Sequence, residues 1–158
     1  MKIRNSLVLL GCGVALSVFT AGAAFATQPG EGLRVTYLVY SGRPNPTLTI
    51  TDPATIRSIQ DGLRQAANGA ARSASAADQP RLGYNGILIE PVGREAAGVQ
   101  YTLKGRAMRS ESMAAAKGAA AQVESQAAVD LEARLLQLGG SQGVLDARTL
   151  GFLLDSTQ

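Results

Sequence analysis

The residue types that most often carry enzymatic chemistry are almost absent from this chain. Its 158 residues include no histidine, and its only thiol belongs to Cys12. Without imidazole, neither a Ser-His-Asp nor a Cys-His nucleophile system can form, and no imidazole is available to a metal. Cys12 lies in an N-terminal segment that we expect to be removed, so the remaining protein has no thiolate and no disulfide. The composition predicts a binding protein rather than an enzyme, with no catalytic residue, no cofactor and no metal site.

A hydrolase that uses carboxylates or a Ser/Lys set is the alternative prediction. Its groups would come from Glu90, Glu95, Ser41 and Lys104, because acid/base catalysis needs paired carboxyls and nucleophilic catalysis needs an activated hydroxyl. A chain with 12 acidic residues contains such carboxyl pairs by chance. No glycine-rich phosphate loop ending in Gly-Lys-Ser or Gly-Lys-Thr is present. The non-enzymatic interpretation is therefore the main one.

The segment Ser41-Gly42-Arg43-Pro44-Asn45-Pro46 is the most distinctive in the chain. Arg43 and Asn45 each precede a proline, which favours extended backbone and makes the loop stiff. A stiff exposed loop loses little entropy on binding, and arginine suits a bidentate grip on a carboxylate or phosphate. The pattern predicts a partner-binding loop that carries Arg43 and Asn45. The alternative is a structural turn in which Arg43 pairs with Asp52 or Glu90.

Tyr84 and Arg106 complete the predicted partner-binding residues. The Tyr84 ring could stack on a ligand, or it could cover the edge of the core with its hydroxyl bonded to backbone. Arg106 belongs to a loose basic cluster that could hold nucleic acid or anionic lipid, or could simply face solvent. With 13 basic and 12 acidic residues after residue 26, the small net charge predicts no nucleic-acid binding. The cluster consists of Arg94, Lys104, Arg106 and Arg109.

Two short motifs resemble a pattern in small uncharacterised bacterial proteins, many of which are exported. The first is the Ser41–Pro46 loop with the β-type segment and the Asp52 helix start that follow it. The second is Leu82-Gly83-Tyr84-Asn85-Gly86. Those proteins often carry tryptophan where this chain has Leu48. The resemblance implies a shared fold core and no activity.

Residues 1–26 have the composition of a secretory signal. Lys2 and Arg4 give a basic start, a long apolar or small-residue run follows, and Ala24-Phe25-Ala26 fits the small-x-small pattern of a cleavage site. We therefore expect an exported protein of the periplasm or medium, with a flexible N-terminus at 27–32. A possible protein partner would be found in the same compartment.

Two other interpretations of the N-terminus are open. The apolar run is long enough to be a retained membrane anchor, although its second half is rich in Ala, Gly and Thr. Leu9-Leu10-Gly11-Cys12 resembles the lipobox of bacterial lipoproteins, in which Cys12 would be lipidated and the protein held at the outer membrane. A lipoprotein cysteine usually closes the apolar stretch, whereas here the stretch continues. Membrane contact is predicted only through the signal or such a lipid anchor.

Residue periodicity predicts about four strands and three helices. The last strand could continue through Met108 with a bend at Gly105. The expected strands are Leu33–Tyr40, Thr47–Thr51, Ile87–Glu90 and Val99–Lys104. The expected helices run from Pro53 to Asn68, from Ala119 to Leu138 and from Asp146 to Leu154.

This order, β-β-α-β-β-α-α, favours an α+β fold with a small, mainly antiparallel sheet of about four strands covered by helices. Residues 33–158 would form one domain with mobile segments near 69–81 and 110–118. In the long helix we expect Leu131 and Leu135 to face the core, with Glu132 on or near the solvent face. Phe152 falls off the apolar stripe of the last helix and is the expected exposed apolar anchor.

Overall fold

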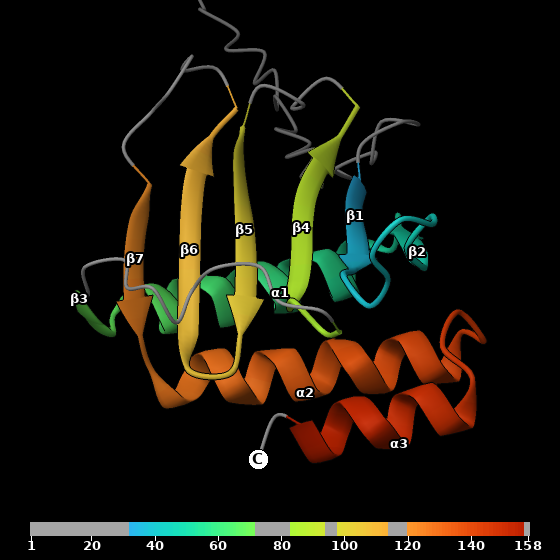
Figure 1. Ribbon diagram of the computed structural model, residues 1–158. Coiled ribbons are helices and arrows are strands. Elements are labelled where there is room, and N and C mark those ends of the chain that lie inside the picture. The colour runs from blue at the N-terminus through green and yellow to red at the C-terminus, as the bar shows by residue number, and fades with distance from the viewer. Residues whose placement is uncertain (1–31, 72–82, 94–97, 114–119, 157–158) are drawn as a thin grey trace, which may run out of the picture.

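The computed structural model describes residues 32–71, 83–93, 98–113 and 120–156. Its helices lie on one side of a seven-stranded antiparallel sheet, whose strand order is β2-β1-β4-β5-β6-β7-β3 (Figure 1). The expected α+β class with an antiparallel sheet is therefore confirmed. The strands are β1 (Gly32–Tyr37), β2 (Thr47–Ile50), β3 (Ala70–Ala71), β4 (Ile87–Val92), β5 (Val99–Lys104), β6 (Ala107–Ser112) and β7 (Ala121–Glu124). The helices are α1 (Pro53–Ala67), α2 (Gln126–Ser141) and α3 (Ala147–Ser156).

The expected count of about four strands and the expected element order are wrong. The observed order is β-β-α-β-β-β-β-β-α-α. After β5 the chain does not bend and continue. Instead Gly105, with φ of 56°, and Arg106 form a tight turn, and Lys104 pairs with Ala107 at the start of β6. Glycine tolerates this left-handed conformation. Gly105 was expected to bend a single strand, but it instead reverses the direction of the chain between two strands.

The segments expected to be mobile are partly strands. Residues 110–112 belong to β6, and Ala70–Ala71 form the short edge strand β3, which pairs with β7. The remaining parts of both segments, 72–81 and 114–118, lie outside the described residues. Backbone pairing with a neighbouring strand makes residues 70–71 and 110–112 parts of the sheet, and that pairing leaves no periodic signal in the sequence.

The start of α2 also differs from the expected helix at Ala119. Residues 121–124 pair with β6 as strand β7, and Ser125 is the residue that caps the helix. The Ser125 hydroxyl accepts a hydrogen bond from the Ala128 amide at 3.2 Å, which satisfies one of the unpaired N–H groups of the first turn. The helix then runs through Gly139 and Gly140 to Ser141.

Both shorter helices begin close to the expected residues. Asp52 caps α1, with its carboxylate accepting from the Thr55 amide at 2.7 Å. Asp146 accepts in the same way from the Thr149 amide at 2.9 Å and precedes α3. These caps depend on residues within one turn, which is why the sequence indicates them.

One face of the sheet supplies the core. Tyr37, Ile87, Leu103 and Met108 are cross-strand neighbours on four strands, and each is at most 3% exposed. Helices α1 and α2 pack together against this face, and α3 packs against α2 (Figure 1). Leu131 and Leu135 of α2 are buried as expected. The helix side chains buried in this core include Ile59, Leu63, Ala66, Ala128, Leu131, Leu135, Leu136 and Leu153.

No helix in the described part of the chain covers the opposite face of the sheet, which is turned toward the viewer in Figure 1. The outward residues alternate with the core residues along each strand, as β geometry requires. A single row of neighbours crosses five adjacent strands of this open face. The row consists of Thr36, Leu88, Thr102, Arg109 and Gln122.

Among the described helices, none combines the length and the apolar character needed to cross a membrane. Phe152 of α3 is 61% exposed, as expected, and its role as an apolar anchor stays a prediction.

Candidate binding site

The loop between β1 and β2 is braced by its own asparagine. The Asn45 side-chain carbonyl accepts hydrogen bonds from the backbone N–H groups of Val39, at 2.9 Å, and Tyr40, at 2.8 Å. The Tyr37 amide donates to the Pro46 carbonyl at 2.9 Å and closes the base of the loop. Asn45 therefore holds the loop in shape, and its carbonyl oxygen faces the loop rather than a partner.

Arg43 is exposed at the tip of this loop, and its guanidinium stacks on the Tyr40 ring with 3.6 Å between the guanidinium carbon and the ring centroid. Neither Asp52 nor Glu90, the two internal partners predicted from the sequence, pairs with Arg43. Asp52 caps α1, and Glu90 lies opposite Arg34 on the neighbouring strand. Stacking orients the guanidinium while leaving the donors at its edge directed away from the ring.

The loop forms one wall of a hollow on the open face of the sheet, with a volume of about 490 Å³. Tyr40 and Asn45 line it from the loop, and Lys104 and Arg109 line it from β5 and β6. The remaining lining residues are Leu38, Asn85, Thr102, Ala107, Glu111 and Gln122. A braced loop therefore stands beside a concave surface that carries polar groups of several kinds.

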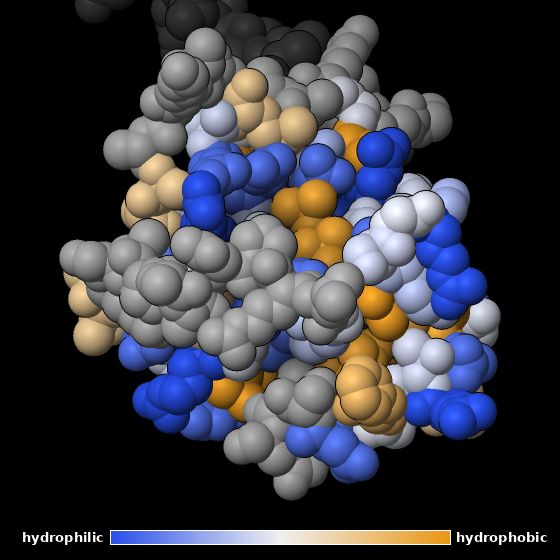
Figure 2. All heavy atoms as spheres, viewed as in Figure 1, coloured by the Kyte–Doolittle hydropathy of each residue, from blue (hydrophilic) through white to orange (hydrophobic). Residues whose placement is uncertain are grey.

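The charges around the hollow are mainly positive. Arg109 forms an ion pair with Glu111 two residues along β6, and Glu111 also accepts from the Gln100 amide at 2.9 Å. Glu111 is thus occupied by its neighbours, while Lys104 and the nearby Arg43 have the opposite charge. Among the residues that Figure 2 leaves visible on this face, a band of hydrophobic residues runs between hydrophilic ones. The surface suits a partner that combines acidic and apolar groups.

Tyr84 is placed away from the walls of the hollow and is tied to the helix layer. Its hydroxyl donates to one carboxylate oxygen of Glu132 at 2.5 Å, and the Gly105 amide donates to the other at 2.6 Å. Glu132 is fully buried, so its expected place near solvent is wrong. Burial raises the pKa of Glu132 above its ordinary value, against the lowering effect of these two hydrogen bonds and of Lys104. The same burial, with the neighbouring carboxylate, raises the pKa of the Tyr84 hydroxyl.

Arg106 lies in the β5–β6 turn rather than on the sheet face with Lys104. It is exposed, and its guanidinium donates to the Gln126 side chain at 3.2 Å. Of the four predicted site residues, Asn45 lines the hollow and Arg43 stacks on Tyr40, which also lines it, whereas Tyr84 and Arg106 are not among the lining residues. Tyr40, Glu111 and Gln122 are residues of the site that sequence reasoning missed. The alternation of residues 107–112 is the signal that would have placed Glu111 beside Arg109 on one strand face.

The groups of the alternative hydrolase are not gathered into one place by the described part of the fold. Leu88 pairs with Thr102 across the antiparallel strands β4 and β5. Glu90 and Lys104 each lie two residues further along their own strands, so they are displaced from this pair in opposite directions. Their positions along the strand direction therefore differ by four residues, a separation of about 13 Å. Ser41 belongs to the loop tip, and Glu95 lies outside the described residues. Within the described ranges, no group of three or more acidic, His or Cys residues is arranged to hold a metal ion.

Comparisons of this chain with protein-family models, with curated proteins and with solved structures found no match.

Proposed function

We propose that this chain is an exported, non-enzymatic binding protein of the bacterial envelope that recognises an acidic segment of a protein partner. The observation that carries the proposal is the braced loop at the edge of a hollow whose lining includes Lys104 and Arg109. The loop is held in shape before the partner arrives, so binding costs little ordering entropy. Arginine and tyrosine, here stacked as Arg43 on Tyr40, are the side chains that most often anchor protein interfaces.

The shape of the surface favours a polypeptide partner over a small molecule. The row from Thr36 to Gln122 crosses five strands, which spans about 19 Å at the usual spacing between strands. An extended segment laid across the strands could contact the whole row. Its carboxylates would meet Lys104 and Arg43, since Arg109 already pairs with Glu111, and its apolar side chains would meet Leu88.

A photocrosslinking experiment tests this proposal. A photoreactive amino acid replaces Gln122 in the hollow, and the purified protein is incubated with envelope extract of the source cells. We expect a discrete adduct whose crosslinked peptide is acidic. Arg43→Glu in the same protein should reduce the adduct at least about fivefold, because loss of an arginine that anchors an interface costs more than about 1 kcal/mol.

Arg148→Glu on α3 is the matched control, since Arg148 is also exposed and the change in charge is the same. It should leave the adduct and the thermal melt unchanged. An adduct that survives Arg43→Glu at full yield, or a crosslinked peptide without acidic residues, would contradict the proposal. So would the absence of any discrete adduct.

A further inference from the structure

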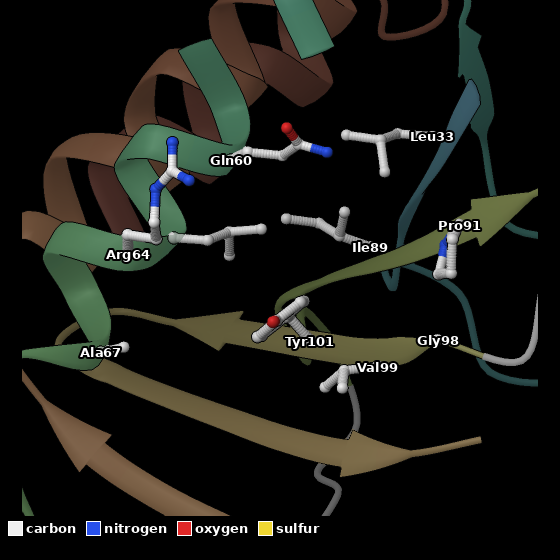
Figure 3. Close-up of a pocket in the computed structure, with 10 residues that line it drawn as sticks. Leu33, Gln60, Arg64, Ala67, Ile89, Pro91, Gly98, Val99 and Tyr101 are labelled. Atoms are coloured by element: carbon white, nitrogen blue, oxygen red, sulfur yellow. The ribbon is translucent and has the colours of Figure 1, made fainter. Parts of the chain in front are cut away.

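A second concave surface lies on the helix-covered side of the sheet, between α1 and the ends of the strands that α2 leaves uncovered (Figure 3). Its volume is about 420 Å³, which falls within the range of small-molecule sites, roughly 300–1,000 Å³. We call it the α1 groove. Its walls are formed by Leu33, Gln60, Leu63, Arg64, Ala67, Ile89, Pro91, Gly98, Val99 and Tyr101.

The groove exists because the apolar face of β5 extends beyond its helical cover. Leu103, Tyr101 and Val99 alternate along this strand toward the same side. Leu103 is fully buried, Tyr101 is partly exposed, and Val99 is 39% exposed. Neighbouring Ile89 of β4 and Leu63 of α1 are buried and complete an apolar floor. An apolar floor that is open to entry favours an apolar ligand body, because binding removes this surface from water.

The rim of the groove carries one charge. Gln60 and Arg64 are one turn apart on α1 and therefore lie on the same helix face, and Figure 3 shows both on the side opposite the strand residues. Arg64 is the only charged side chain among the lining residues, and none of them is acidic. Arg64 also pairs with Asp61, but both side chains are more than half exposed. Exposed pairs of this kind contribute little, so the guanidinium remains available to a ligand anion.

We propose that the α1 groove binds a small amphipathic carboxylate, with its hydrocarbon body on the apolar floor and its carboxylate at Arg64 and Gln60. Arginine can hold a carboxylate with two parallel hydrogen bonds, and the Gln60 amide adds a further donor. The groove and the hollow lie on opposite faces of the sheet. This inference therefore does not depend on the partner proposed above, and either can fail without the other.

Calorimetric titration of the purified protein with decanoate tests the site. Decyltrimethylammonium is the comparison probe, because it has a similar chain and the opposite charge. We expect saturable binding of decanoate at least about tenfold tighter than that of the cation, since hydrogen bonds to charged groups are among the stronger ones. Arg64→Ala should remove this preference. Arg57→Ala, at another exposed arginine of α1 outside the groove, should preserve it.

A groove-filling variant separates the groove from a general surface effect. Ala67 is exposed and lines the groove at the end of α1, so Ala67→Phe adds a ring to the groove without entering the core. It should weaken decanoate binding at least about tenfold while the thermal melt stays unchanged. The proposal is overturned if decanoate shows no saturable binding, if the cation binds equally well, or if Ala67→Phe binds decanoate as tightly as the parent protein.

Discussion

Glu132 is the one acidic or basic side chain that is completely buried among the described residues. Its two carboxylate oxygens accept from the Tyr84 hydroxyl and the Gly105 amide, so it joins α2 to the β5–β6 turn and to the segment before β4. A buried carboxylate costs desolvation energy and is tolerated where hydrogen bonds satisfy it. We infer that Glu132 positions the end of the hairpin that carries Lys104 and Arg109.

The raised pKa of Glu132 predicts a pH dependence of stability. The folded protein binds this proton more readily than the unfolded chain, whose carboxyl keeps its ordinary pKa near 4.5. The stabilising effect of the proton is therefore complete below pH 4.5 and is lost as the pH rises through the higher folded-state pKa. Glu132→Gln has no such proton, so its urea midpoint should vary less with pH over this range than that of the parent protein.

Glu132→Ala is the companion variant. It should show the same weaker pH dependence but unfold more easily at every pH, because the Gly105 amide and the Tyr84 hydroxyl lose a buried acceptor. The expected loss is about 2–4 kcal/mol in the free energy of unfolding. Urea curves for Glu132→Gln that follow those of the parent protein at all pH values would show that Glu132 does not titrate with folding.

The packing of α2 on the sheet depends on the small size of Gly139. A Cβ atom there would lie 2.5 Å from the Tyr37 hydroxyl oxygen, which itself donates to the Leu135 carbonyl at 2.8 Å. Tyr37 is fully buried at the end of β1, where the binding loop begins. The helix and the base of the loop are thus in direct contact through one glycine and one tyrosine.

Two glycine substitutions in helices should therefore act in opposite directions. Gly139→Ala gains helix propensity but forces α2 away from Tyr37, and overpacking of this kind costs about 1–3 kcal/mol. Gly151→Ala in α3 meets no atom within 4 Å, so it should stabilise the protein by up to about 1 kcal/mol. Thermal denaturation measures both. An unchanged or raised Tm for Gly139→Ala would contradict the close contact of α2 with Tyr37.

The whole molecule presents two unlike faces. The open face carries the braced loop and a hollow lined by Lys104 and Arg109, and the helix-covered side carries the apolar α1 groove. A sheet covered by helices on one side allows this division, because alternate residues of every strand face opposite ways. With Cys12 as the only cysteine, no disulfide within the chain can contribute, and the fold depends on the single core between sheet and helices.

The proposed export predicts a defined N-terminus for the mature protein. Cleavage after Ala26 leaves Thr27 as the first residue, because Ala24-Phe25-Ala26 provides the small residues that the peptidase reads. Intact mass spectrometry of the protein recovered from the envelope or medium should give this mass. A mass that starts at Cys12 with added acyl chains would identify a lipoprotein instead, and a mass that includes Met1–Ala26 would contradict cleavage.

The sequence by itself determined the features that depend on near neighbours along the chain. The Asp52 cap, the strands around Val35 and Tyr101, and the buried stripe of Leu131 and Leu135 follow from spacing of a few residues, and the structure agrees with them. It also indicated that Arg43 and Asn45 lie in one loop, although the bracing role of the Asn45 carbonyl emerged only from the structure.

Tertiary structure decided what depends on distant partners. β3 and β7 are strands because they pair with other strands, and Glu132 is buried because Tyr84, 48 residues away, supplies its hydrogen bond. The hollow joins residues from Leu38 to Gln122. Such contacts are set by how the strands align and how the helices pack, and these long-range choices leave no local pattern in the chain.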